Sequence, residues 1–126
     1  ASALTSADII VSSGGVSVGD YDYVDQILES LGAEIHLRAV GIKPGKPLTF
    51  ATFNRDEAKR SVLYFGLPGN PASSLVTFWR FVQPALKKLS GLVRGWQPIF
   101  VQARAGKDLR SDGKRETYLW GQMHLI

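Results

Sequence analysis

Three predicted strands in this 126-residue chain each run directly into a turn built from glycine or proline. Residues 8–13 end at a pair of glycines, residues 34–42 precede Pro44, and residues 62–67 precede Pro68. The first and third segments are rich in β-branched, aromatic and leucine side chains, which is typical of buried strands. A chain whose strands end in such turns is predicted to form an α/β layer, with the turns at the ends of the strands.

Apolar residues at helical spacing predict two helices. The first covers residues 22–31, with Gly32 placed for a left-handed C-cap. The second covers residues 72–89, and Pro84 inside it should kink or split it, because proline removes an intrahelical hydrogen bond. A further strand is predicted over residues 48–53. The second helix is expected to bury Leu75, Trp79, Val82, Leu86 and Leu89.

The pattern changes after about residue 91, which divides the chain into two predicted parts. Residues 1–91 are predicted to be part of an α/β domain with a parallel or mixed sheet. Residues 92–126 are predicted to begin a small all-β domain, because residues 97–105 and 117–125 alternate between apolar and polar side chains.

Composition excludes several classes of site and location. The chain has no cysteine, which excludes disulfides, thiolate metal sites and a cysteine nucleophile, and which fits a cytoplasmic protein. No apolar run approaches the roughly 18 residues needed to span a bilayer, so no membrane association is expected. We also predict no signal peptide. The net charge is +4, and residues 87–126 hold eight Lys/Arg against three Asp/Glu. A solvated basic surface is the favoured interpretation of this charge over a nucleic-acid-binding one.

The first turn, residues 12–22, combines glycines, hydroxyls and carboxylates between a strand and a helix, where open α/β sheets bind ligands. Glycine lets the backbone approach a ligand closely, and free N–H groups with hydroxyls suit a phosphate. Asp20 and Asp22 are candidate ligands for Mg²⁺ that a phosphate shares. The alternative is a tight turn in which the aspartates cap the helix. The glycines and serines of residues 12–22 are therefore candidates for binding a phosphate.

The second turn, residues 43–47, holds two lysines between two prolines. Because Pro44 and Pro47 stiffen this turn, Lys43 and Lys46 are candidates for binding a small oxyanion or a phosphate. The alternative is a surface turn whose lysines serve solubility.

The third turn, residues 66–74, again joins a predicted strand to a helix. The N–H groups of residues 72–74 and the hydroxyl of Ser73 would lie at the positive end of that helix. The alternative is that Asn70 or Ser73 caps the helix, with Pro71 in its first turn. If all three turns meet at one edge of the sheet, they form a site for an anionic ligand, with Mg²⁺ as a candidate partner.

Taken together, three segments resemble the motif series of the MoeA/gephyrin E-domain family of molybdopterin molybdenumtransferases, in the same order and with similar spacing. The segments are SGGVSVGDYDYV, IKPGKPLTFA and FGLPGNPASSLVTF. The resemblance extends over residues 8–91, and the basic tail matches the family more loosely. Jointly the three motifs are highly specific, although none of them would be so alone.

The resemblance implies a function and a fold. Enzymes of this family insert molybdenum from molybdate into molybdopterin, using an adenylylated pterin and Mg²⁺. They have a three-layer molybdopterin-binding α/β domain followed by a β domain, and they form homodimers whose pockets use both subunits. Family members are much longer, so turnover by this chain alone is not expected. By the resemblance, Asp22, Lys43 and Lys46 are catalytic, Asp20 and Asp22 face the metal, and Ser13, Gly14, Gly15, Ser17, Pro68, Pro71, Ser73 and Arg115 bind the cofactor.

Three alternatives stay open at this point. The chain could be a non-catalytic module that binds a pterin or a nucleotide, or an interaction scaffold of the same fold. A nucleic-acid binder is the third alternative, and strong salt dependence of DNA binding would identify it.

Overall fold

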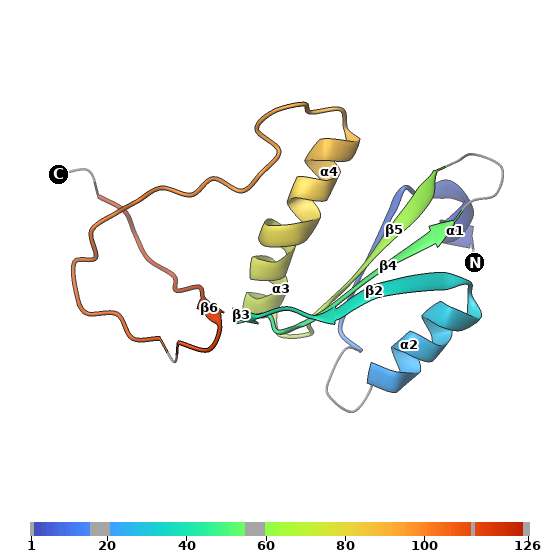
Figure 1. The fold of residues 1–126 in the computed structure, drawn as a ribbon, viewed down its shortest axis with the longest axis horizontal. Helices are drawn as coiled ribbons and strands as arrows, with labels where there is room; N and C mark the ends of the chain where they lie inside the picture. Colours follow the sequence, from blue (N-terminus) through green and yellow to red (C-terminus); the bar gives the residue numbers. More distant parts are fainter. Residues whose placement is uncertain (1, 16–20, 55–59, 112, 125–126) are drawn as a thin grey trace.

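The computed structural model of the chain describes residues 2–15, 21–54, 60–111 and 113–124. Figure 1 shows a twisted sheet with helices on both faces and a long tail that leaves one end of the domain. In chain order the elements are α1 (Ser2–Ser6), β1 (Ile9–Ser13), α2 (Tyr21–Ser30), β2 (Ala33–Ala39), β3 (Ile42–Lys43), β4 (Pro47–Asn54), β5 (Ser61–Leu67), α3 (Pro71–Thr77), the π-helix η1 (Phe78–Val82), α4 (Gln83–Leu89) and β6 (Glu116–Thr117).

The main sheet is mixed, which confirms the predicted fold class. Its strand order is β1-β5-β4-β2, with β1 parallel to β5 and β4 antiparallel to both of its neighbours. It follows that β1, β5 and β2 run in the same direction and that β4 alone runs the other way. The carboxyl ends of three strands and the start of β4 therefore lie at one edge of the sheet.

Two hydrophobic cores lie on opposite faces of this sheet and make the domain three-layered. On one face, Leu28 of α2 packs with Phe53, Val62 and Tyr64, and Leu4 of α1 lies against the same cluster. On the other face, Val82 at the end of η1 packs with Leu48, Phe65 and Leu67. In Figure 1, α3 and α4 accordingly cover one face of the sheet, and α2 covers the other. The second core also holds Ile9, Leu37, Val40, Phe50, Leu63, Phe78, Phe81 and Ala85.

The first helix forms within one residue of its predicted bounds, and Gly32 follows it with φ of 82°. Its apolar stripe is covered only in part. Leu28 is buried, whereas Tyr23 is 69% exposed and Ile27 and Leu31 are also exposed. The strand β1 is likewise less buried than predicted, because it is an outermost strand of the sheet with only β5 beside it.

The second helix is split, as Pro84 led us to expect. Five residues adopt π-helical geometry between α3 and α4, and Pro84 lies in the first turn of α4. Of the predicted buried face, Val82 is buried and Trp79 is half-buried. The prediction was wrong at Leu75, Leu86 and Leu89, which are exposed. A π turn holds more residues than an α turn, so the 3.6-residue spacing used for the prediction does not continue through η1.

The tail does not form the strands that were predicted over residues 97–105 and 117–125. Between residues 92 and 124, apart from residue 112, the described chain contains only the two-residue strand β6. Alternating side chains form a strand only where another strand offers hydrogen bonds, and here only β3 does so. The division at residues 91 and 92 stays a prediction.

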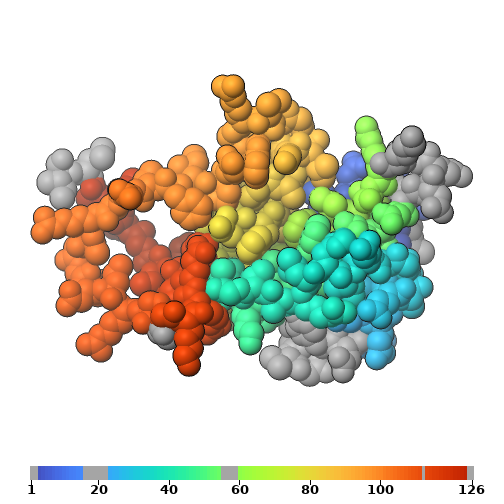
Figure 2. Space-filling model, in the orientation of Figure 1, coloured from blue at the N-terminus to red at the C-terminus, as the bar shows by residue number. Residues whose placement is uncertain are grey.

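Large apolar side chains are exposed along this tail. Val93 and Ile99 are more than 80% exposed, and Figure 2 shows the tail extending from the compact part of the molecule as a thin layer. None of the helices in the described ranges combines the length and the apolar character that crossing a bilayer demands.

Leu48 should contribute far more to stability than a leucine on the outer side of α4. Leu48 is 1% exposed between the sheet and η1, whereas Leu89 is 57% exposed. We expect Leu48→Ala to lower the free energy of unfolding by about 2–5 kcal/mol, because it leaves a cavity. The matched change Leu89→Ala should cost less than about 1 kcal/mol. Urea denaturation of both variants measures the difference, and equal losses would contradict this packing.

Candidate functional site

The three turns picked out from the sequence meet at the edge where β1, β2 and β5 end. The backbone N–H of Gly14 donates to the carbonyl of Leu67 over 3.1 Å, which joins the turn after β1 to the end of β5. A Cβ placed on Gly69 would lie 3.5 Å from the Cα of Gly14. The turn at residues 43–47 enters the same edge, because β4 starts there. The predicted convergence is confirmed for the described residues.

The turn after β1 requires its glycines. Gly14 and Gly15 have φ of 83° and 73°, a region that other residues seldom adopt. Ser13 precedes them at the end of β1 and is exposed. A hydrogen bond that no sequence pattern indicated supports this strand end, with the hydroxyls of Ser12 and Tyr64 2.6 Å apart. Tyr64 is buried, so this bond ties the turn to the core.

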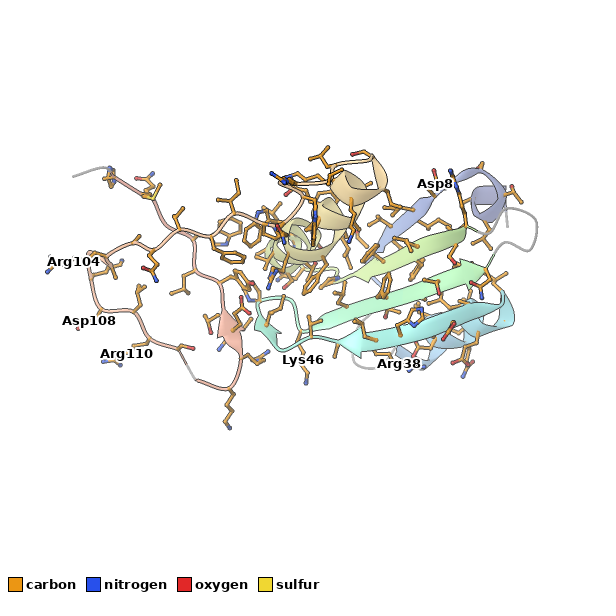
Figure 3. All side chains as sticks on the ribbon, turned by 45° about the horizontal axis from the view of Figure 1, so that its top comes forward. Asp8, Arg38, Lys46, Arg104, Asp108 and Arg110 are labelled. Carbon is orange, nitrogen blue, oxygen red and sulfur yellow. The ribbon has the colours of Figure 1, made fainter. Side chains whose placement is uncertain are left out.

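The lysine turn, residues 43–47, packs tightly against α3. The Lys43–Pro44 peptide is cis, and Gly45 has φ of 111°. A Cβ on Gly45 would lie only 2.7 Å from Cγ2 of Thr77, so the turn and the helix approach as closely as glycine allows. Both lysine side chains are exposed, and Lys46 projects outward from the edge of the sheet in Figure 3. The contacts that hold this turn are therefore made at its backbone and at Gly45, while the lysine side chains are exposed.

The third turn confirms the capping alternative. Asn70 is the N-cap of α3, with its side chain accepting from the N–H of Ser73 over 3.2 Å, and Pro71 occupies the first turn. The hydroxyl of Ser74 donates to the carbonyl of Pro68. The N–H of Ser73 is consequently engaged within the protein, and the predicted role of these N–H groups at an open helix end is not supported at Ser73. Pro68, Pro71 and Ser73 do lie at the common edge.

The tail brings Arg115 to the lysine turn. β6 pairs in parallel with β3, with Ile42 opposite Glu116 and Lys43 opposite Thr117. The N–H of Glu116 donates to the carbonyl of Gly41 over 2.9 Å. Arg115 directly precedes this pair and is half-buried. A third basic residue, more than 60 positions away in sequence, thus lies beside the strand that leads into the turn.

Tyr118 fixes this stretch of the tail to the helix. Its hydroxyl accepts from Nε of Arg80 over 3.0 Å and donates to the carboxylate of Glu116. Burial and the hydrogen bond to Glu116 raise the pKa of the Tyr118 hydroxyl, and Arg80 opposes that rise. No local sequence pattern pointed to this residue, because its partner Arg80 lies 38 residues away along the chain.

The candidate metal ligands fall largely outside what is described. Ser17 and Asp20 lie outside the described residues, and Asp22 lies in the first turn of α2, where its side chain is likewise not described. Among the described residues, no group of three carboxylate, imidazole or thiolate side chains could hold a metal ion. A Mg²⁺ site at this edge would therefore depend on Asp20 and Asp22 together with ligands from a bound phosphate.

The helix that carries Asp22 is anchored by residues that the sequence analysis missed. Arg38 of β2 donates to the carboxylate of Asp25, and its other end lies 3.4 Å from Glu29. Asp25 is buried, so its charge lies against the guanidinium rather than in water. The pair fixes α2 to the strand β2 and so helps to fix where the first turn of α2 lies.

Comparisons with known proteins agree on one family. Residues 1–88 match the family described as a probable molybdopterin binding domain. The molybdopterin molybdenumtransferase of Nostoc sp. is 64% identical over 124 residues, which are 98% of this chain and 28% of that protein. The enzyme of the same name from Haemophilus influenzae is 39% identical over 86% of this chain and 25% of its own length. The molybdenum cofactor synthesis protein cinnamon of Drosophila melanogaster is 48% identical over 67% of this chain and 13% of its own length. The chain thus spans little more than a quarter of these relatives at most.

Gly45→Ala should displace the lysine turn, and a second substitution should relieve it. The added Cβ would collide with Cγ2 of Thr77, so we expect a loss of more than about 1 kcal/mol in unfolding free energy, beyond what the positive φ alone costs. Gly91→Ala is the matched control, because Gly91 has φ of 92° with open space around it.

Thr77→Ser removes the colliding methyl group and keeps the hydroxyl that bonds to the carbonyls of Ser73 and Ser74. The double variant should therefore recover part of the stability lost in Gly45→Ala. Urea denaturation of the four proteins in this cycle measures the coupling, and strict additivity would refute the close contact.

Proposed function

Because the chain belongs to the family of probable molybdopterin-binding domains, we propose that it is part of an enzyme that inserts molybdenum from molybdate into molybdopterin. One observation carries the proposal. The glycine turn, the lysine turn and the proline turn meet at a single sheet edge, beside which β6 brings Arg115. That edge offers a basic wall, formed by Lys43, Lys46 and Arg115, next to a glycine turn that a phosphate can approach.

The basic wall suits molybdate by charge and by geometry. Molybdate is a small dianion, and Lys43, Lys46 and Arg115 would supply three positive charges from two adjoining segments. The turn is held by the contact between Gly45 and Thr77, so little ordering is needed when the anion binds. Charge-assisted hydrogen bonds from ammonium and guanidinium groups to oxyanions are among the strong ones in proteins. We assign Lys43 and Lys46 to molybdate, with Arg115 as their neighbour.

The glycine turn suits the phosphate end of the pterin. Ser13, Gly14, Gly15 and Ser17 would bind that phosphate through backbone N–H groups and hydroxyls. Pro68, Pro71 and Ser73 would form the adjoining wall.

Asp20 and Asp22 would hold Mg²⁺ together with phosphate oxygens. When bound, Mg²⁺ would neutralise and polarise the phosphates of an adenylylated pterin. What the protein's own residues contribute is the placement of the two anions side by side.

The relatives' names refer to proteins of which this chain spans a quarter or less in most cases. We therefore propose that the complete reaction also needs residues that are not part of this chain. We extend the proposal to a homodimer, which the exposed apolar side chains of the tail support, and to a cytoplasmic location, which the absence of cysteine supports.

Lys46→Ala should weaken molybdate binding much more than pterin binding. Losing one charge-assisted contact should raise the dissociation constant for molybdate about tenfold, or about 1.4 kcal/mol. Lys107→Ala is the matched control, because Lys107 is an exposed lysine of the tail. Isothermal titration calorimetry with molybdate and, separately, with molybdopterin measures both affinities. An equal loss for the two ligands would contradict the division of roles.

Asp22→Asn should weaken the binding of molybdopterin in the presence of Mg²⁺. The amide removes the negative charge that would hold the metal and keeps nearly the same size. Asp108→Asn, an exposed aspartate on the tail in Figure 3, is the control. Titration of molybdopterin into each protein, with and without Mg²⁺, gives the affinities. If the affinity for molybdopterin is the same with and without Mg²⁺, and the same in the wild type and in Asp22→Asn, a non-catalytic binding module would be favoured.

A further inference from the structure

The lysine turn is held from two sides by one short stretch of helix. On one side, Gly45 lies against Thr77, the last residue of α3. On the other side, the carbonyl of Lys43 accepts from the N–H of Tyr118 over 2.8 Å, and Tyr118 is itself bound to Arg80. Thr77 and Arg80 are three residues apart. The position of the turn thus depends on a contact within the sequence motifs and on a second contact outside them.

Several interactions hold Tyr118 and Arg80 in place at the second contact. The ring of Tyr118 meets Trp79 edge to face, with 5.9 Å between the ring centroids. Its hydroxyl bridges the guanidinium of Arg80 and the carboxylate of Glu116. The guanidinium also lies 5.2 Å from the ring centroid of Phe100, which limits where it can move. Tail and helix are thereby tied together through the phenol oxygen of Tyr118, and its backbone N–H ties both to the turn.

The π-helix gives Arg80 its place in this network. Residues 78–82 adopt π-helical geometry, and such single turns inside α-helices are frequent at functional sites. Arg80 comes from the middle of this segment and reaches the tail. The half-buried state of Arg80 and Tyr118 keeps the bond partly out of water, where a bond to a charged donor is stronger.

We propose that Tyr118 and Arg80 are positioning residues for the oxyanion site, which set the place of Lys43 and Lys46 without touching the ligand themselves. This inference rests on the proposed binding of molybdate at the lysine turn. Because Glu116 and Tyr118 bond to the carbonyl groups on either side of Ile42, loosening Tyr118 frees the strand that leads into the turn. Arg115 is displaced by the same change, since it directly precedes Glu116.

Tyr118→Phe is the sharpest test, because it removes only the hydroxyl. The ring can still pack on Trp79, and the backbone N–H can still bond to Lys43. We expect the dissociation constant for molybdate to rise about tenfold, the lower end of the loss seen when an outer-shell partner is removed from a metal site. The affinity for molybdopterin should change less than twofold. Tyr23→Phe, on the exposed side of α2, is the matched control and should change neither.

A measurement without ligand separates this inference from the proposed function. The N–H groups of Val40 and Tyr118 donate to the carbonyls of Lys46 and Lys43, so their hydrogen exchange reports on the turn. Exchange at these two amides should become about tenfold faster in Tyr118→Phe and stay unchanged in Tyr23→Phe. If wild-type protein binds no molybdate, the proposed function fails, while faster exchange would still support the positioning role. Unchanged exchange at the turn in Tyr118→Phe would overturn the positioning role, whatever the molybdate affinity.

Arg80 provides an independent check by the same measurements. Arg80→Gln should reproduce the loss of molybdate affinity, and Arg80→Lys, which keeps a cationic donor, should restore part of it. Combining Arg80→Gln with Tyr118→Phe should cost no more than either change alone, because both break one bond. Additive losses of affinity would show that the two residues act separately. They would refute the claim that both act through their shared hydrogen bond.

Discussion

The hydrogen bonds that make β4 antiparallel to β5 decide which loops of this chain can meet. Had β4 run with its neighbours, the lysine turn would have entered the sheet at the far end, away from the glycine and proline turns. Because β4 alone is reversed, the segment before it closes on the same edge that β1 and β5 leave. The register of Gly66 opposite Thr49 then sets how far each turn reaches. Every proposed contact with ligand depends on that arrangement.

Local signals in the sequence predicted much of this fold, because its strands and turns are specified by neighbouring residues. The glycine pair after β1, the Asn70 cap and the split at Pro84 all follow from backbone preferences of single residues. Contacts between distant segments were missed for the opposite reason. Nothing in the residues around Tyr118 indicates that β3 lies beside it. The same lack of a partner explains why residues 97–105 remain without a strand.

The candidate site was predicted in a similarly uneven way. Residue type and turn chemistry identified Lys43, Lys46 and the glycine turn, since their roles depend on charge and on φ. The supporting contacts through Tyr64, Arg38 and Thr77 were not predicted. A buried hydroxyl or an ion pair between a strand and a helix produces no periodic pattern in the sequence. The aspartates of the first turn stand apart, because their side chains are not described. Sequence reasoning therefore found the groups that would bind ligand and missed those that hold them.

The π-helical segment accommodates one residue more than an α-helical turn would, because its hydrogen bonds span five residues instead of four. Deleting one residue between Thr77 and Val82 would therefore restore α-helical geometry and leave α3 and α4 packed on the sheet as they are now. The deletion would instead change the direction in which Arg80 leaves the helix. The helix would then keep its core and lose its hydrogen bond to Tyr118 in the tail.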